Sequence, residues 1–192
     1  MTRIWAAHRL AAMTIKNGDN FSDSKKMLKD LYARKLSEFK EVEPGVFVRT
    51  QGLSVWYVLA TLKTQDPNKT LKQLGSINGF MSVLRFPTND EVYSVFVDPK
   101  LQGKGLGKRL YTIAHKYCKK FLASSEDLGS MSLGVWLSLY RDNEKIQFVV
   151  ANKKLPRKDV HIEGLNVVWT YKGKSVNLVG EKLPLFTLRW PK

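Results

Sequence analysis

The sequence EVYSVFVDPKLQGKGLGKRLYTIAHKYCKKF, which spans residues 91–121, decides the fold of this 192-residue chain. An apolar and β-branched run, Val92–Val97, predicts a strand that ends before Pro99. A glycine-rich turn follows at 102–107, and apolar residues then recur at helical spacing up to Phe121. The stretch therefore predicts a strand, a glycine-rich turn and a helix in succession.

The glycine-rich turn predicts a binding site for an anion such as a phosphate. The first backbone N–H groups of a helix have no partner within the helix, and the helix dipole favours negative charge beside them. Gly103, Gly105 and Gly107 have no side chains to keep an anion away from these groups. Neither the spacing of a Rossmann loop nor that of a Walker A loop is present.

What is present is Q-x-x-G-x-G, preceded by V-x-V-x-P and followed by an amphipathic helix. This combination resembles motif A of the GNAT superfamily of N-acetyltransferases. The resemblance implies an α/β GNAT fold in a single domain over residues 1–192, with a mixed, mostly antiparallel sheet and a central strand, loop and helix that bind CoA. It also implies acetyl-CoA as co-substrate and transfer of an acetyl or other small acyl group to an amine. The implied mechanism is direct attack in a ternary complex, without a covalent enzyme intermediate.

The resemblance also assigns residues to the co-substrate. In the family the loop N–H groups hold the pyrophosphate, and here the side chains of Gln102, Lys104 and Lys108 would support them. The preceding strand carries a bulge near its end, where its backbone binds the pantetheine arm and polarises the acetyl carbonyl. The implied donor site comprises Val95, Phe96, Val97, Gln102, Gly103, Lys104, Gly105, Leu106, Gly107 and Lys108.

Two residues are predicted to move protons. Glu91, counted back from Gln102, stands where histone-type members of the superfamily carry a glutamate general base. Glu126 and Asp127 are alternatives for this role. Tyr140 lies in a Leu-Tyr pair that resembles the family's general acid for the leaving CoA thiolate, and the alternative is a core aromatic.

Two other reactive side chains are not expected to take part in catalysis. His115 is expected on the solvent-facing side of the helix that follows the loop. Cys118, on the same helix, is interpreted as a packing residue or a surface thiol.

The charge balance bears on the acceptor. With 32 Lys and Arg against 17 Asp and Glu, the formal net charge is +15, which attracts polyanions. One interpretation is solubility and attraction for CoA, and the other is a nucleic acid, or an amine bound to a nucleic acid, as acceptor. Aromatic residues beside the basic loop 153–158 could stack bases, but are interpreted as core residues: Trp56, Tyr57, Trp169, Tyr171 and Trp190.

Composition argues against several other classes of protein. The single cysteine excludes an internal disulfide and favours a reducing cytoplasm. One cysteine and three histidines make a zinc site improbable, so no metal ligands are predicted. No run of 18 apolar residues is present, so no membrane partner is expected, and the apolar N-terminal patch is broken by His8 and Arg9.

Hydrophobic periodicity predicts the remaining elements. Residues 5–13 are ambiguous, and a helix is expected from Ser22 or Ser24 to about Lys40, ended by Pro44 and Gly45. A second helix is predicted over 132–141 and a basic loop at 152–159. The last strands are expected to complete one sheet. The predicted strands are 46–50, 54–62, 74–85, 146–151, 166–171, 175–179 and 186–190.

The chain departs from the family pattern after Phe121. Residues 122–132 are polar, where a typical member has a hydrophobic strand that splays from its neighbour. The order Asp127, Ser130, Ser132 and Trp136 resembles GNAT-like proteins encoded by bacteriophages, some of which act on DNA bases. The polar segment also supports an alternative function, in which a GNAT-like domain has lost catalysis and serves as a nucleic-acid-binding or phage structural module.

Overall fold

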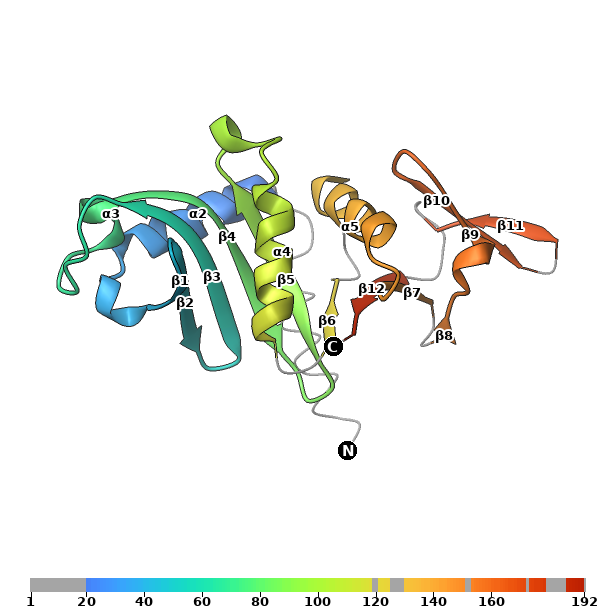
Figure 1. Ribbon diagram of the computed structural model, residues 1–192, viewed down its shortest axis with the longest axis horizontal. Helices are drawn as coiled ribbons and strands as arrows, with labels where there is room; N and C mark the ends of the chain where they lie inside the picture. Colours follow the sequence, from blue (N-terminus) through green and yellow to red (C-terminus); the bar gives the residue numbers. More distant parts are fainter. Residues whose placement is uncertain are drawn as a thin grey trace.

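The computed structural model describes residues 20–118, 121–124, 130–150, 153–171, 173–178 and 186–191. These residues form two sheets (Figure 1). The larger has nine strands in the order β1-β2-β3-β4-β5-β6-β12-β7-β8, and the smaller has three in the order β11-β10-β9. The described pairings are antiparallel except for that of β5 with β6, which is parallel. The predicted α/β fold with a mixed, mostly antiparallel sheet is therefore confirmed.

The bounds of the elements are as follows. The helices are α2 (Asn20–Ala33), α3 (Leu71–Leu74), α4 (Leu106–Tyr117) and α5 (Ser130–Asp142), with 3-10 helices η1 (Leu36–Glu38), η2 (Pro99–Leu101) and η3 (Arg157–Asp159). The strands of the large sheet are β1 (Lys40–Glu43), β2 (Val46–Gln51), β3 (Ser54–Leu62), β4 (Gly75–Arg85), β5 (Asn89–Val97), β6 (Phe121–Ala123), β7 (Gln147–Val150), β8 (Lys153–Lys154) and β12 (Phe186–Trp190). Those of the small sheet are β9 (Val160–Glu163), β10 (Asn166–Tyr171) and β11 (Lys174–Asn177).

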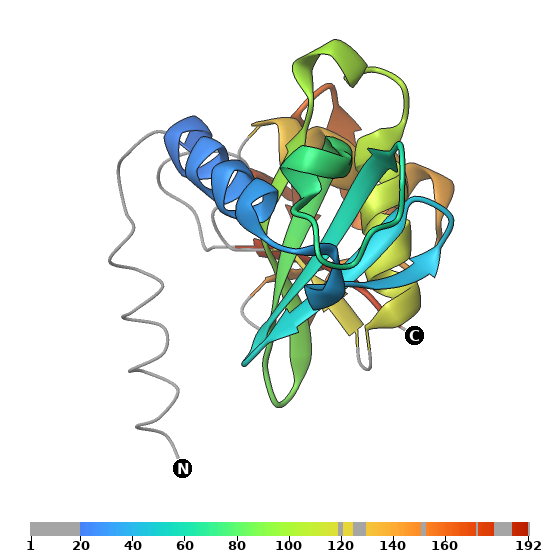
Figure 2. The ribbon, with the colours of Figure 1, turned by 90° about the vertical axis from the view of Figure 1, so that its left-hand side faces the viewer.

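Helices α2 and α4 lie on opposite faces of the large sheet (Figure 2). On the α2 face, Leu31 packs in a core with Val58 and Phe80, and the rings of Phe80 and Phe96 stack with their centroids 5.4 Å apart. On the α4 face, Leu110 and its helix neighbours pack in a larger core that includes Val92 and continues to α5. We use the terms α2 face and α4 face for these two sides of the sheet.

The first long helix is shorter than predicted. It ends at Ala33 instead of about Lys40, because the next residues bond to a distant loop. The N–H of Leu36 donates to the carbonyl of Lys69 at 3.0 Å, and that of Leu71 donates to the carbonyl of Arg34 at 2.9 Å. Tertiary hydrogen bonds thus replace the helical ones, and 40–43 becomes a strand that pairs with β2.

The C-terminal part was predicted to complete one sheet, and this prediction is wrong. Strand β12 enters the large sheet between β6 and β7, whereas β9, β10 and β11 form the separate small sheet. The predicted basic loop contains β8 and η3, and β9 was not predicted. The small sheet has an apolar face, on which Val160 and Val167 pack in the same core as α5. Because this face is buried against α5, the three strands form a sheet of their own instead of extending the large sheet.

The segment after α4 is closer to the family pattern than its composition indicates. Residues Phe121–Ala123 form β6, which runs parallel to β5 and pairs with it from Asn89 to Glu91. The hydrophobic strand that was thought to be missing is therefore present, although it is short. Residues 125–129 and the ambiguous segment 5–13 lie outside the described residues.

Candidate active site

Strands β5 and β6 pair over only three residues and then part. Asn89 pairs with Phe121 and Glu91 with Ala123, where β6 ends. Strand β5 continues to Val97, and no described strand pairs with this edge of it beyond Glu91. A strand edge without a strand partner suits hydrogen bonds to an extended ligand.

The glycine loop follows directly at the end of β5. Gln102 ties it to the strand, since its Nε2 donates to the carbonyl of Val97 at 3.4 Å. Gly103 and Gly105 both have φ of +77°, a left-handed conformation that side chains disfavour. A Cβ placed on either glycine would meet no described atom within 4 Å, so the loop is open on that side.

The backbone N–H groups of this loop lie at the start of α4. Gly105 is the N-cap of the helix, and its carbonyl accepts from the N–H of Arg109 at 3.0 Å. Within the described part of the chain, no acceptor takes a hydrogen bond from the backbone N–H groups of 103–108. Donors left open at a helix N-terminus form an anion site, and the open glycine Cα positions give a phosphate room to approach. These residues fit the pyrophosphate of acetyl-CoA.

The basic side chains near the loop are not equivalent. Lys104 is exposed in the loop itself. Lys108 forms an ion pair with Asp142, the last residue of α5. Lys116 pairs with Glu43 at 2.6 Å, at the other end of α4. The sequence placed Lys104 and Lys108 together as phosphate ligands, whereas in the structure Lys108 also joins α4 to α5.

The predicted bulge in the co-substrate strand lies earlier than expected. Ser82 of β4 pairs with Ser94 and the next residue, Val83, pairs with Val92, so the extra residue is Tyr93. Val95 to Val97 pair regularly with β4 instead of forming the bulge. The reason is that Val92, Val95 and Val97 all pack in the core of the α4 face, which requires one extra residue between the first two.

The predicted base lies where the strands part. Glu91 is half-buried, between Leu84 of β4 and Ala123 of β6 in the strand register. Because the neighbouring Val92 is buried in the core of the α4 face, alternation places Glu91 on the α2 face. Glu126 and Asp127, the alternative bases, lie outside the described residues.

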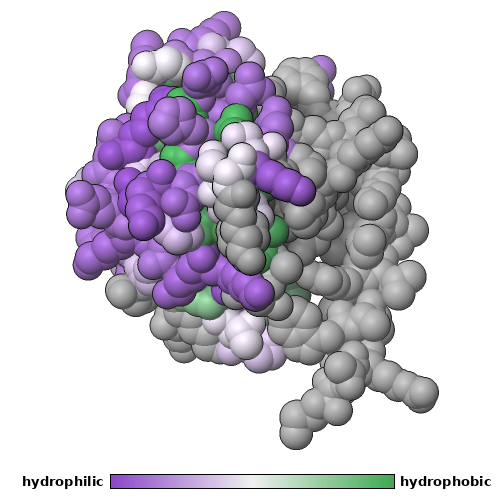
Figure 3. Space-filling model, turned by 90° about the vertical axis from the view of Figure 1, so that its right-hand side faces the viewer, coloured by the Kyte–Doolittle hydropathy of each residue, from purple (hydrophilic) through white to green (hydrophobic). Residues whose placement is uncertain are grey.

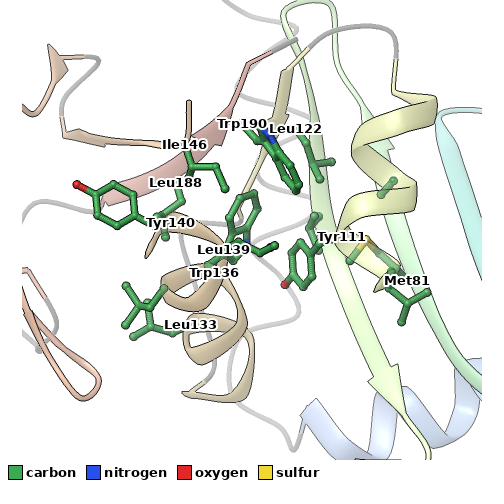
Figure 4. Close-up of a cluster of buried hydrophobic side chains, with 14 of the residues drawn as sticks. Met81, Tyr111, Leu122, Leu133, Trp136, Leu139, Tyr140, Ile146, Leu188 and Trp190 are labelled. Carbon is green, nitrogen blue, oxygen red and sulfur yellow. The ribbon is translucent and has the colours of Figure 1, made fainter. Parts of the chain in front are cut away.

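The predicted acid is held in a different environment. Tyr140 lies on α5 with 5% of its surface exposed. Its ring packs edge-on against Phe148 and under the guanidinium of Arg157, 3.8 Å from the ring centroid. Burial raises the pKa of its hydroxyl. In Figure 4 this hydroxyl points away from Tyr111 of α4 and Met81 of β4, so the structure does not bring it toward β5.

Helix α5 packs on α4 just below the loop. A Cβ on Gly107 would lie 3.3 Å from Cγ2 of Val135, which explains the third loop glycine by close packing. Deeper in this interface the rings of Tyr111 and Trp136 meet edge-on at 5.0 Å (Figure 4). Burial raises the pKa of Tyr111, and among the described residues neither its hydroxyl nor the indole N–H of Trp136 has a hydrogen bond of good geometry.

The two reactive side chains at the C-terminal end of α4 are packed. His115 is half-buried and stacks on Trp190 with ring centroids 4.2 Å apart, so its expected surface position was wrong. Cys118 is buried, and its Sγ contacts the carbonyl of His115 at 3.1 Å. Of the residues suggested for stacking on bases, Tyr57 and Trp190 are also buried. The side chain of Tyr171 lies outside the described set.

The charged surface lies elsewhere. Figure 3 shows that hydrophilic residues cover most of the described surface on the side of the small sheet. There Lys153, Lys154 and Lys158 are exposed.

In the described ranges, no group of three or more His, Cys, Asp or Glu residues is arranged to hold a metal ion. None of the helices described is long and apolar enough to cross a membrane.

Sequence analysis missed two residues at the parting of the strands. Tyr93 is the extra residue of the bulge, and Ser82, opposite Ser94, is buried with a hydroxyl that has no described hydrogen-bond partner. The signal for the bulge was in the sequence. The apolar positions 92, 95 and 97 break the two-residue alternation of a strand between 92 and 95.

One family model matches part of this chain, and two solved structures are similar to it. Residues 56–131 match the family model described as the acetyltransferase (GNAT) family. A structure of an IAA acetyltransferase from Bacillus cereus ATCC 14579 is 20% identical with a TM-score of 0.39, over 73% of this chain and 79% of that one. A GNAT-family protein from Bacteroides thetaiotaomicron is 14% identical with a TM-score of 0.39, over 89% and 82% of the two chains. A search of curated proteins gives no match.

The matched segment runs from β3 through the glycine loop and α4 to the start of α5, and so contains the whole loop site. The two solved structures are too distant to assign a function to this chain. The match of residues 56–131 to the GNAT family model supports an acetyl-CoA-dependent N-acetyltransferase.

Proposed function

We propose that the protein transfers an acetyl or other small acyl group from acyl-CoA to an amine by direct attack in a ternary complex. The observation that carries the proposal is the run of N–H groups at 103–108, which have no acceptor among the described residues. They lie beside the edge of β5 that pairs with no described strand beyond Glu91. The first feature suits a pyrophosphate and the second suits the pantetheine amides. Together they give a donor path that leads from the loop to Glu91.

On this path each predicted residue has a distinct role. The N–H groups of Gly103 to Lys108 hold the pyrophosphate, with Lys104 as an exposed counter-charge. Gln102 fixes the loop to the strand through its bond to Val97. The backbone of Val95, Phe96 and Val97 binds the pantetheine arm, and one of its N–H groups stabilises the developing oxyanion.

The base acts on the acceptor. An amine is protonated at neutral pH, so a carboxylate must take a proton before or during attack. Glu91 lies where β5 and β6 separate, which supports a role for it at the end of the proposed donor path. The amine nitrogen then bonds to the acyl carbon, the carbon–sulfur bond breaks, and a proton must reach the CoA thiolate. Tyr140 is the acid that the family resemblance suggests.

The acceptor we propose is an amine on a nucleic acid or on a molecule bound to one. The support is the formal net charge of +15 and the exposed lysines at 153, 154 and 158. The affinity for DNA and for RNA should therefore fall steeply as salt increases, with a slope that reports the number of phosphates contacted. A flat salt dependence would exclude a nucleic acid as a direct partner.

The rival function is a nucleic-acid-binding or phage structural module without catalysis. It was motivated by the polar segment 122–132, which in the structure contains the end of β6 and the start of α5. Calorimetric titration with acetyl-CoA separates the two functions. Binding heat supports the acyltransferase, and its absence in the presence of nucleic acid binding supports the rival.

Mass spectrometry of candidate acceptors incubated with acetyl-CoA tests the reaction itself. Peptides, polyamines, tRNA and DNA are the acceptors to include, and an acetyl mass increase on one of them is expected. The Glu91→Gln variant should lose about 100-fold or more of this activity if Glu91 is the base. Glu163→Gln, which removes the same charge from an exposed position on β9, is the matched control. Equal activity of the two variants would remove Glu91 from the mechanism.

A further inference from the structure

The turn between β9 and β10 lies close to the glycine loop, across α5 from it. A Cβ on Gly107, the last loop glycine, would lie 3.3 Å from Cγ2 of Val135. A Cβ on Gly134, the preceding residue of α5, would lie 3.7 Å from Cδ2 of Leu165 in the turn. In Figure 1 the loop and the turn lie at the same end of the molecule, with α5 between them. One turn of α5 therefore lies beside both.

Leu165 presents apolar surface at this place. Glu163 pairs with Asn166, so the turn consists of Gly164, with φ of +60°, and Leu165, which is 43% exposed. An exposed leucine is not by itself evidence of a site. Leu53 is 56% exposed in an equivalent Gly-Leu turn between β2 and β3. What distinguishes Leu165 is its position beside the helix turn that contacts the loop.

The donor proposed above has a part for which no residue has been named. The pyrophosphate of acyl-CoA is joined on one side to the pantetheine arm, which follows β5 in the proposed function, and on the other side to adenosine. Helix α5 separates the loop from Leu165 by about the width of one helix, roughly 10 Å, and a ribose with its base spans a comparable distance. The faces of the adenine ring are apolar, and ligand sites combine apolar walls with a few polar groups.

We propose that Leu165 is the apolar platform on which the adenine ring of the acyl-CoA donor lies; this inference rests on acyl-CoA as the donor in the proposed function. The loop N–H groups hold the pyrophosphate, and the β9–β10 turn holds the base on the other side of α5. The segment that matches the family model ends at residue 131, so this turn is an addition outside the match. The small sheet then serves the donor site, in addition to covering α5.

The platform is tested with two ligands that differ in the adenosine. Acetyl-CoA carries it, and acetyl phosphopantetheine ends at a phosphate without it. Leu165→Asn removes the apolar surface, and asparagine is a residue that such turns favour. In calorimetry this variant should bind acetyl-CoA about 3-fold to 10-fold more weakly than wild type, as expected for the loss of a partly buried apolar contact. Its affinity for acetyl phosphopantetheine should stay within about two-fold, which also shows that the variant is folded.

Leu53→Asn is the matched control, because it makes the same change in the equivalent turn between β2 and β3. Its affinity for both ligands should stay within about two-fold of wild type. Equal affinities of Leu165→Asn and Leu53→Asn for acetyl-CoA would overturn the inference. An equal loss of both ligands in Leu165→Asn would do the same, since the effect would then not involve adenosine.

A direct measurement of the contact uses NMR with isotope-labelled leucine methyl groups. In the complex with acetyl-CoA, the adenine ring protons should show nuclear Overhauser effects to one leucine whose signals are absent in Leu165→Asn. Effects to other leucines alone would refute the platform. Wild-type protein that binds acetyl-CoA no more tightly than acetyl phosphopantetheine would also refute the platform but leave the proposed function intact. Wild-type protein that binds neither ligand would refute the proposed function itself.

Discussion

Replacing Gly105 by alanine tests the anion site with little disturbance of the protein. The new methyl group would meet no described atom within 4 Å, so the protein itself has room for it. It would occupy the space through which a phosphate reaches the loop N–H groups. The loss of one hydrogen bond to a charged group corresponds to about 1.5–3 kcal/mol, or a Kd for acetyl-CoA that rises roughly 10-fold to 100-fold.

Gly52→Ala, in the turn between β2 and β3, is the matched control for the backbone strain that Gly105→Ala introduces. Its φ is +56° and a Cβ there also meets no described atom within 4 Å. Gly52→Ala and Gly105→Ala should therefore both lower the free energy of unfolding by about 1–2 kcal/mol in urea titrations. Only Gly105→Ala should weaken acetyl-CoA binding in calorimetry. Equal affinities of the two variants would refute the assignment of the loop.

Three further predictions follow from individual contacts. Asp142→Asn releases Lys108 from its ion pair and should tighten acetyl-CoA binding a few-fold at low salt but not at high salt, with a stability change below about 1 kcal/mol, as measured by calorimetry and urea unfolding. Gly134→Ala, whose Cβ would lie 3.7 Å from Leu165, should stabilise α5 by about 0.5–1 kcal/mol, and a destabilised variant would contradict the packing. Burial raises the pKa of Tyr57 to about 12 from an ordinary value of 10.0, so its contribution to stability is complete below pH 10 and is lost as the pH rises toward 12. Tyr57→Phe should show a smaller decline in unfolding free energy over that interval, and an identical decline would exclude Tyr57 as its source.

The strand, loop and helix at 91–121 could be predicted from the sequence because each of them is specified by a local pattern of residues. The alternation of β3, the apolar run of β5 and the glycine spacing are set by neighbours within a few residues. The C-terminal end of α2 could not be predicted in this way. It depends on hydrogen bonds from Leu36 to Lys69 and from Leu71 to Arg34, which join it to a segment distant in sequence, and no pattern within the helix predicts them.

The division of the C-terminal strands between two sheets was not predicted, for a related reason. Val160 and Val167 look like ordinary strand residues, and only their burial against α5 shows that they belong to a second sheet. At the site, the motif located the donor loop, but the direction of the Tyr140 side chain depends on helix packing, which no local pattern reports. The family spacing suggested Tyr140 as the acid, whereas its ring is enclosed by Phe148 and Arg157.

The position of β12 has a consequence for how the chain folds. Ala123 of β6 pairs with Arg189, so the middle of the large sheet is joined by the last strand described. Until that strand has left the ribosome, β6 and β7 lack the neighbour between them, and both present open edges able to pair with another chain. Such long-range pairing is slow to form, because a long loop must close before it is stabilised. Folding yield should therefore be more sensitive to changes in 186–190 than to changes in the hairpin of β2 and β3, which can pair early during synthesis.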